Sequence, residues 1–272
     1  MSLFCCPICS APLTRGERAY TCPNGHSYDI AREGYVHLLP PNHMHSKAPG
    51  DDKAMVAARN RFLSAGYYAP LRDALSQLAL RYAGERAVLL DSGCGEGYYT
   101  AGVAGALRQS GREVTAAGGD ISKFALRYAA RRDREREFAV GSAYRLPAAD
   151  GCAGLLLNCF SPLAAEEFHR VLAADGVFFY VVPAPDHLWE MKEVLYETPY
   201  PNPDENTCYD GFRFLEMVPV RTSLPLAGPA LMDLFGMTPY AWKTPRDGVE
   251  RLRSLSSLDV RASFRIHVFQ AI

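Results

Sequence analysis

Two short pairs of metal-binding side chains stand near the amino terminus. Cys6 and Cys9 form a C-x2-C pair, and twelve residues later Cys22 and His26 form a C-x3-H pair. Each pair encloses a turn-forming residue, so the chain can fold back and bring all four side chains to one tetrahedral zinc ion. A redox role is less favoured because no βαβ pattern surrounds the pair, and Cys5 is interpreted as a bystander. Because protein side chains fill all four positions, we expect a structural zinc site.

A glycine-rich turn follows the first strongly apolar segment of the larger part of the chain. Residues 88–100 read VLLDSGCGEGYYT, with Asp91 before the turn and Gly93, Gly95 and Gly97 within it. A strand, a glycine turn and a helix in this order let the backbone approach a ligand closely, and the helix start offers free N–H groups. The G-x-G-x-G spacing resembles motif I of the class I S-adenosylmethionine (SAM) methyltransferases. The resemblance implies that the turn holds the methionine part of this cofactor.

Polar residues also end two later apolar segments. Asp120 ends residues 114–120, where the methyltransferase pattern implies a carboxylate that accepts hydrogen bonds from ribose hydroxyls. A helix N-cap is a second role for Asp120, and both can hold at once. Asn158 ends residues 154–158, where open α/β sheets bind ligands. It is a candidate contact to the substrate or to the methionine part of the cofactor, or a simple turn former.

The composition narrows the class of protein. The 272 residues are 48% hydrophobic, which is enough for a packed core, and the formal net charge of −1 excludes a globally basic nucleic-acid binder. No apolar run is long enough to span a bilayer, and no secretory signal is recognised, so we expect no membrane partner. Eight cysteines without such a signal indicate a reducing, cytoplasmic environment.

The pattern predicts an α/β protein in which a class I SAM-methyltransferase Rossmann-like sheet follows a small N-terminal zinc-binding module. The predicted parts are a zinc-binding module at residues 1–40, a linker with helices at 41–84 and a SAM-dependent methyltransferase domain at 85–272. Fewer than forty residues cannot build a core alone, so a metal ion is also what the first part requires. Alternating apolar and polar residues at 212–222 and 261–269 predict edge strands.

Further motifs extend the resemblance nearly from end to end. They include CPIC, CPNGH, REGYVHLLP, LDSGCGEGYYT, MTPYAW and FRIHVFQ. Together they resemble the bacterial 23S ribosomal RNA guanine-N1-methyltransferases, the RlmA family of types I and II. The resemblance implies methyl transfer from SAM to N1 of a guanine in a 23S rRNA hairpin, a structural zinc ion and a homodimer. Some type II relatives contribute to macrolide resistance, which the resemblance implies as a further role.

The resemblance also implies a set of cofactor-binding residues. They are Tyr68, Asp91, Gly93, Gly95, Glu96, Gly97, Asp120 and His187. Taken alone, Tyr68 is equally a packing corner, and His187 is an ordinary histidine at a helix start. Guanine N1 carries a proton, so a general base would help its methylation. The sequence identifies no such base, and His187 and Asn158 are only weak candidates for a catalytic role.

The sequence leaves open the roles of residues 123–136 and of Trp242, and it leaves two alternative functions. Residues 123–136 carry six basic and two acidic side chains, which is typical of a solvated helix face or of a phosphate-binding surface. Trp242 is either a core residue or a platform for an extruded base. The alternative functions are a SAM methyltransferase for a small molecule and a non-catalytic, zinc-stapled RNA-binding protein. Methylation of an rRNA hairpin and binding of SAM separate them.

Overall fold

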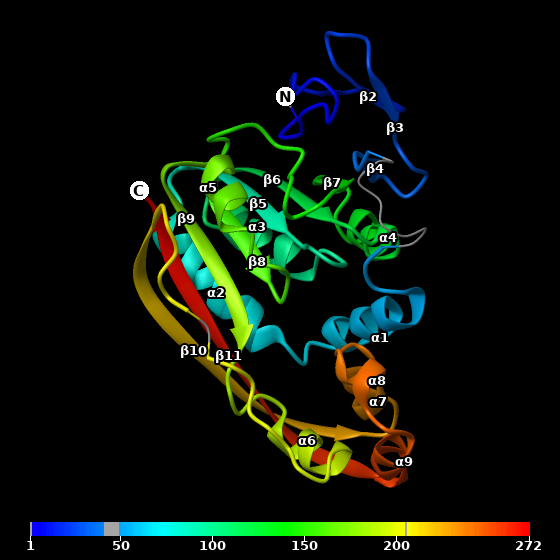
Figure 1. The fold of residues 1–272 in the computed structure, drawn as a ribbon. Helices are drawn as coiled ribbons and strands as arrows, with labels where there is room; N and C mark the ends of the chain where they lie inside the picture. Colours follow the sequence, from blue (N-terminus) through cyan, green and yellow to red (C-terminus); the bar gives the residue numbers. More distant parts are fainter. Residues whose placement is uncertain (1, 41–48, 205) are drawn as a thin grey trace.

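The computed structural model describes residues 2–40, 49–204 and 206–272, and its strands form two separate sheets (Figure 1). The smaller sheet is antiparallel and contains β1 (Thr14–Arg15), β2 (Ala19–Thr21) and β3 (Ser27–Asp29). It lies within the predicted zinc-binding module, which we call the ribbon (residues 2–35). The first eight residues of the predicted linker, 41–48, lie outside the described residues.

The larger sheet has eight strands in the order β10-β11-β9-β8-β5-β6-β7-β4. They are β4 (Val36–His37), β5 (Arg86–Ser92), β6 (Glu113–Asp120), β7 (Glu137–Val140), β8 (Ala153–Cys159), β9 (Leu172–Pro183), β10 (Phe212–Ala227) and β11 (Ser257–Ala271). The pairs from β4 across to β9 are parallel, and β11 and β10 join antiparallel. The strand order reverses between β5 and β8, which is where open α/β sheets bind ligands. The predicted Rossmann-like sheet is confirmed.

Nine helices flank the strands in the described part of the chain. They are α1 (Lys53–Ser64), α2 (Ala69–Tyr82), α3 (Tyr98–Gln109), α4 (Lys123–Arg132), α5 (Ala165–Val171), α6 (Trp189–Leu195), α7 (Pro229–Gly236), α8 (Tyr240–Lys243) and α9 (Arg246–Ser254). The hydroxyl of Ser122 accepts from the backbone N–H of Ala125, so Ser122 and not Asp120 is the N-cap of α4. None of these helices is both long and apolar enough to cross a bilayer.

Consecutive residues of the central strands face two different hydrophobic cores. Leu89 packs with α2 and α3 on one face of the sheet, whereas Leu90 faces the other side together with Phe168 of α5. This alternation is the period of two expected of an extended strand with both faces covered. The core on the α5 side also contains Phe4 and Tyr20 of the ribbon. The ribbon and the large sheet therefore share one core.

Direct backbone and side-chain contacts also join the ribbon to the large sheet. The carboxylate of Glu137, at the start of β7, accepts from the Ser2 hydroxyl at 3.1 Å, the Leu3 N–H at 3.1 Å and the Tyr20 hydroxyl at 3.0 Å. Strand β4 pairs with β7 at the edge of the large sheet, although it lies inside the predicted range 1–40. The ribbon is thus built onto β7 and β4 (Figure 1).

The carboxyl-terminal third differs from its predicted arrangement in one respect. Strand β10 lies at the edge of the sheet as expected, but β11 pairs with β9 on one side and with β10 on the other. The prediction of an edge strand at 261–269 is therefore wrong. Its alternation is interrupted at residues 262–264 and 266–269, which are buried because β11 has a strand on each side and α6 packs against it. The basic run at residues 123–136 is not one solvated helix face, because α4 ends at Arg132 and Arg136 is buried.

Candidate active site and zinc centre

The four predicted zinc ligands come together at one end of the ribbon. The sulfurs of Cys9 and Cys22 lie 3.7 Å apart, and His26 Nδ1 lies 3.3 Å from the Cys22 sulfur and 3.5 Å from those of Cys6 and Cys9. All four ligand atoms lie within 4.8 Å of one another. A tetrahedral zinc ion with ordinary bond lengths requires about 3.8 Å between two sulfurs and about 3.6 Å between sulfur and nitrogen. The set fits zinc, with His26 binding through Nδ1.

Neighbouring polar groups support these ligands. The amide of Asn24 donates to the Cys9 sulfur at 3.3 Å, and the Tyr28 hydroxyl lies 3.0 Å from the Cys6 sulfur. The hydrogen bond from Asn24 lowers the pKa of the Cys9 thiol to about 7, which favours the thiolate that metals bind. Outer contacts of this kind orient metal ligands. Cys5 is outside the ligand cluster, as predicted.

The predicted glycine turn between β5 and α3 has the backbone that only glycine adopts readily. Gly93, Gly95 and Gly97 have φ values of 77°, 54° and 73°. A Cβ atom on Gly93 would lie 2.1 Å from the hydroxyl oxygen of Ser161, and one on Gly97 would lie 3.1 Å from the Cβ of Ala129. Gly97 is also the N-cap of α3. The turn is therefore held tightly against the segment after β8 and against α4.

Asp120 ends β6 beside this turn. One carboxylate oxygen accepts from the Gly95 N–H at 2.9 Å, and the other accepts from the Ser122 N–H at 2.7 Å. Burial raises the pKa of Asp120, while these hydrogen bonds act in the opposite direction. Each carboxylate oxygen has two acceptor sites, so both oxygens retain capacity for hydroxyl donors of a ligand.

Arg59 of α1 crosses the glycine turn and was not predicted to lie here. Its guanidinium donates to Glu96 at 2.6 Å and to Asp51 at 2.5 Å, and the position of a Cβ on Gly95 would be 3.5 Å from it. Burial alone would lower the pKa of Arg59, but its two carboxylate partners raise it. The Glu96 carboxylate is thus engaged by Arg59. This ion pair fastens α1 to the turn.

Four buried polar atoms near the carboxyl ends of β5 and β8 have no hydrogen-bond partner among the described residues. They are Asp91 Oδ1, Ser92 Oγ, Tyr99 OH and Asn158 Oδ1. The other Asp91 oxygen accepts from the Thr100 hydroxyl at 2.5 Å, and the Asn158 amide donates to the Pro162 carbonyl at 3.1 Å. A buried polar atom without a partner costs about 1–3 kcal/mol. Four in one region indicate a polar ligand.

The electrostatics of this region favour a cation. Burial raises the pKa of Asp91 to about 7, and the negative charges of Asp120 and Glu96 add to the effect, whereas the hydrogen bond from Thr100 opposes it. A positively charged ligand beside Asp91 would favour its ionised form and relieve this penalty.

An aromatic cluster connects the remaining predicted residues. The ring of Tyr68 is buried between Phe62 and Phe264, with centroids 5.2 Å and 4.8 Å away. His187 packs on Phe264 at 4.7 Å, and its Nδ1 accepts from the Ser263 N–H at 3.2 Å. Burial lowers the pKa of His187 to about 3, so the ring is neutral and a poor proton acceptor.

Phe160, just after β8, extends this cluster toward solvent. Its ring lies 6.5 Å from that of Tyr99 and 5.5 Å from that of Phe264, between centroids. The residue is 46% exposed and has a φ of 57°, which non-glycine residues seldom adopt. Strained backbone and an exposed ring beside a ligand region suggest a functional position.

Comparison with known proteins decides the family. Residues 4–47 match the family model described as "RlmA, N-terminal", and residues 90–180 match the one described as "Methyltransferase domain". A 23S rRNA (guanine(748)-N(1))-methyltransferase of Streptomyces fradiae is 35% identical over 253 residues, covering 90% of this chain and 88% of that protein. The chain belongs to the family of 23S rRNA guanine-N1-methyltransferases.

Other relatives of this methyltransferase agree with the assignment. A Micromonospora griseorubida protein, provisionally named 23S rRNA (guanine-N(1)-)-methyltransferase, is 35% identical over 98% of this chain and 97% of its own length. A chain in the structure of a Haloferax volcanii methyltransferase with its Trm112 activator superposes with a TM-score of 0.50. It is 20% identical and covers 80% of this chain and 96% of that one, so it supports the fold alone.

The methyltransferase region fits SAM, and the ribbon fits zinc. SAM has a positive sulfonium, an ammonium group and two ribose hydroxyls, which match the acidic turn, the orphaned Asp91 oxygen and the Asp120 carboxylate. Of the predicted cofactor residues, the glycines, Asp91, Glu96 and Asp120 surround the turn, whereas Tyr68 and His187 meet at Phe264 in the aromatic cluster.

Sequence reasoning missed several residues of this methyltransferase site. Arg59, Ser92, Tyr99 and Phe160 were not identified as site residues. The position of Phe160, directly after a strand that ends in Asn158 and Cys159, is the one local signal for it. Arg59 carried no local signal, because its partners lie elsewhere in the sequence.

Proposed function

We propose that this protein transfers the methyl group of SAM to N1 of a guanine in a hairpin of 23S rRNA. The observation that carries the proposal is the similarity over nine-tenths of the chain to a relative of that activity, together with an intact ribbon and glycine turn. A small-molecule methyltransferase would not account for the ribbon. A non-catalytic protein would not account for the four orphaned polar atoms beside the turn.

We assign the cofactor contacts as follows from the site. Asp120 accepts from the ribose hydroxyls, and Asp91 Oδ1 accepts from the ammonium group. Ser92 and Asn158 complete the polar surroundings of the methionine part. When bound, SAM supplies an activated leaving group, so the protein's task is alignment of the reacting atoms and exclusion of water.

Phe160 is the proposed platform for the target guanine. The Watson–Crick edge of a paired guanine is hidden, so the base must leave its stack before N1 can react. An exposed ring beside Asn158 offers a face for such a base. A hollow of about 230 Å³ adjoins the same cluster and is lined in part by Phe264, Asp186 and Arg221. The buried ring of His187, whose Nδ1 already accepts a hydrogen bond and whose pKa is lowered by burial, argues against His187 as the proton acceptor.

Methylation of a synthetic 23S rRNA hairpin with radiolabelled SAM tests the proposal. We expect incorporation into the RNA and a reverse-transcription stop at one guanine, since N1-methylation blocks base pairing. An Asp120→Asn variant is the control for cofactor dependence. Binding of SAM without methylation of the hairpin, or methylation at another atom, would contradict the proposed function. The mapped position also tells whether the target is guanine 748, the base named for the Streptomyces fradiae relative.

The location and the oligomeric state of the enzyme are proposed from this activity and from the family resemblance. We propose that it acts on ribosomal RNA in the cytoplasm, and that it does so as a homodimer, as the family resemblance implies. Light scattering of the purified protein gives its mass in solution. A mass of about 30 kDa would show a monomer, because one chain has a mass of 30.0 kDa, and would contradict the dimer.

A further inference from the structure

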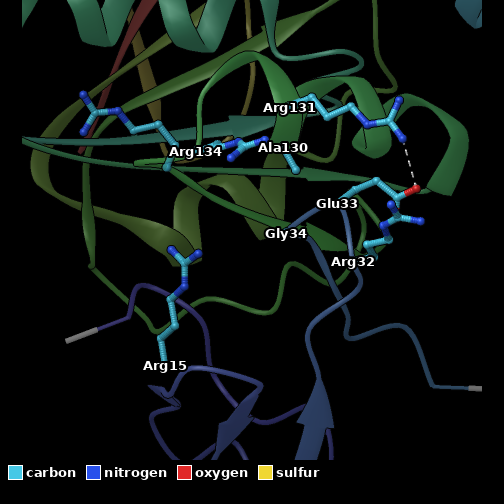
Figure 2. A pocket seen from close by; sticks show the side chains of 8 residues that line it. Arg15, Arg32, Glu33, Gly34, Ala130, Arg131 and Arg134 are labelled. Carbon is cyan, nitrogen blue, oxygen red and sulfur yellow. Dashed lines mark hydrogen bonds and ion pairs between the residues drawn. The ribbon is translucent and has the colours of Figure 1, made fainter.

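A second polar site lies where the ribbon meets α4, away from the glycine turn. It is a hollow of about 510 Å³ (Figure 2). Its lining residues are Arg15, Arg32, Glu33, Gly34, Ala130, Arg131, Arg134 and Arg136. Figure 2 shows Arg15 reaching toward the hollow from the ribbon, with Arg131 and Arg134 on the α4 side. We call this hollow the arginine pocket.

The protein neutralises only part of the charge of the arginine pocket. Its single lining carboxylate, Glu33, is 3.3 Å from Arg131 and 3.7 Å from Arg127. Arg15, Arg32 and Arg134 are exposed, and their guanidinium groups make no hydrogen bond or ion pair with another described residue. Exposed arginines often find a nearby acid, and the chain as a whole has a net charge of −1. Of the five arginines, Arg131 is paired with Glu33 and Arg136 with Asp133, so the three that remain form a local positive site on a nearly neutral molecule.

Arg136 gives the pocket a buried wall. The residue is 5% exposed, and its Nε has no hydrogen-bond partner among the described residues. The same nitrogen lies 3.4 Å from the Asp133 carboxylate, and Nη1 donates to the Val114 carbonyl at 3.3 Å. Packing therefore holds this guanidinium in place beside the pocket. A prearranged donor of this kind binds an anion at a lower entropic cost than a mobile surface side chain.

A row of basic residues leads from the cofactor end of α4 to the pocket. Lys123, Arg127 and Arg131 are four residues apart and so lie on one face of α4. The helix begins three residues beyond Asp120 and spans about 15 Å. Arg132 instead turns inward and donates to the Glu96 carbonyl at 3.1 Å. The basic residues of 123–136 thus form two groups in the structure. Lys123, Arg127 and Arg131 form a row on one face of α4, whereas Arg132 faces inward and has a structural role.

We propose that the arginine pocket binds backbone phosphates of the RNA substrate, several nucleotides away from the methylated guanine. Guanidinium groups match phosphate oxygens with two parallel hydrogen bonds, and clustered arginines recognise phosphodiesters without reading sequence. The pocket combines residues from the ribbon and the methyltransferase domain, so a phosphate in it contacts both. The inference rests on the proposed function, because it takes an RNA as the substrate.

The test replaces the three exposed, unpaired arginines together in R15Q/R32Q/R134Q. A matched control, R86Q/R246Q/R253Q, removes the same charge from exposed positions on β5 and α9. Fluorescence anisotropy with a labelled 23S hairpin is recorded over a range of salt concentrations. We expect the pocket variant to raise the Kd at least tenfold, and to reduce the slope of log K against log salt by about one for each lost contact. The control should stay close to the wild type.

Activity assays separate this inference from the proposed function. We expect the pocket variant to raise KM for the hairpin while kcat at saturating RNA and the Kd for SAM stay unchanged. Equal RNA affinity of the pocket and control variants would overturn the inference. So would calorimetric binding of inorganic phosphate with no loss of RNA affinity in the variant, because the pocket would then serve a free ion. Loss of RNA binding in the variant, but no methylation of guanine by the wild type, would overturn the function and support the pocket.

Discussion

The buried Asp91 makes the stability of the cofactor-free protein depend on pH in a predictable direction. Its pKa is about 7 in the folded protein and 3.8 as an ordinary aspartate, a separation of about three pH units. At about 1.4 kcal/mol for each pH unit, the folded state disfavours the Asp91 carboxylate by about 4 kcal/mol. The residue is 1% exposed, so solvent does not screen this cost.

The folded state keeps the Asp91 proton over a range in which the unfolded chain has lost it. As pH rises from about 4 through the folded pKa of about 7, the contribution of Asp91 to stability therefore falls, and it levels off about one pH unit higher. Between pH 5 and pH 8 this loss is about 2.5 kcal/mol. Asp91→Asn removes the titration, so the melting temperature of the variant relative to wild type should rise by about 5–10 °C over the same interval.

Thermal denaturation of both proteins at pH 5, 6, 7 and 8, without and with SAM, measures this effect. SAM should stabilise the wild type more at pH 8 than at pH 5, because its positive charge favours ionised Asp91, and this pH dependence should be absent in Asp91→Asn. Glu113→Gln, at a carboxyl whose side chain is 76% exposed, is the matched control and should parallel the wild type. Parallel pH curves for Asp91→Asn and wild type would refute the reasoning.

Three further variants or treatments test other parts of the site. Gly93→Ala should weaken SAM binding by about tenfold or more, because φ is 77° and the new Cβ would meet Ser161; unchanged calorimetric affinity would show that the turn has room. Metal analysis should find one zinc ion for each chain, and its loss in His26→Ala should lower the melting temperature; an equally stable metal-free protein would contradict a structural role. Phe160→Ala should raise KM for the hairpin about tenfold while Phe160→Tyr retains it, and equal values would exclude stacking.

Local patterns in the sequence were sufficient for the zinc ligands and the cofactor turn. Cys6, Cys9, Cys22 and His26 are paired within four or five consecutive residues, so the spacing alone brings each pair together. The three glycines were recognisable because a turn with positive φ at every second residue can be formed readily by few residues other than glycine. The class of fold followed from the order of strands, glycine turn and helices.

Features formed by distant segments could not be read in this way. Arg59 meets Glu96 across 37 residues, and the arginine pocket gathers side chains from β1, from the turn before β4 and from the end of α4. The position of β11 inside the sheet depends on its pairing with β10, which the alternation of β11 itself does not reveal. In each case the decisive neighbour is remote in sequence, and no local pattern specifies it.

The contacts around Glu137 hold the ribbon at one fixed position relative to the methyltransferase domain. Because the Glu137 hydrogen bonds, strand β4 and a shared hydrophobic core join the ribbon to the large sheet, the ribbon cannot pivot without breaking these contacts. An RNA bound in the arginine pocket would therefore present its bases to the methyl donor at a fixed distance from the pocket. Lengthening or shortening the hairpin by one base pair would then shift which nucleotide is offered, with the protein itself unchanged.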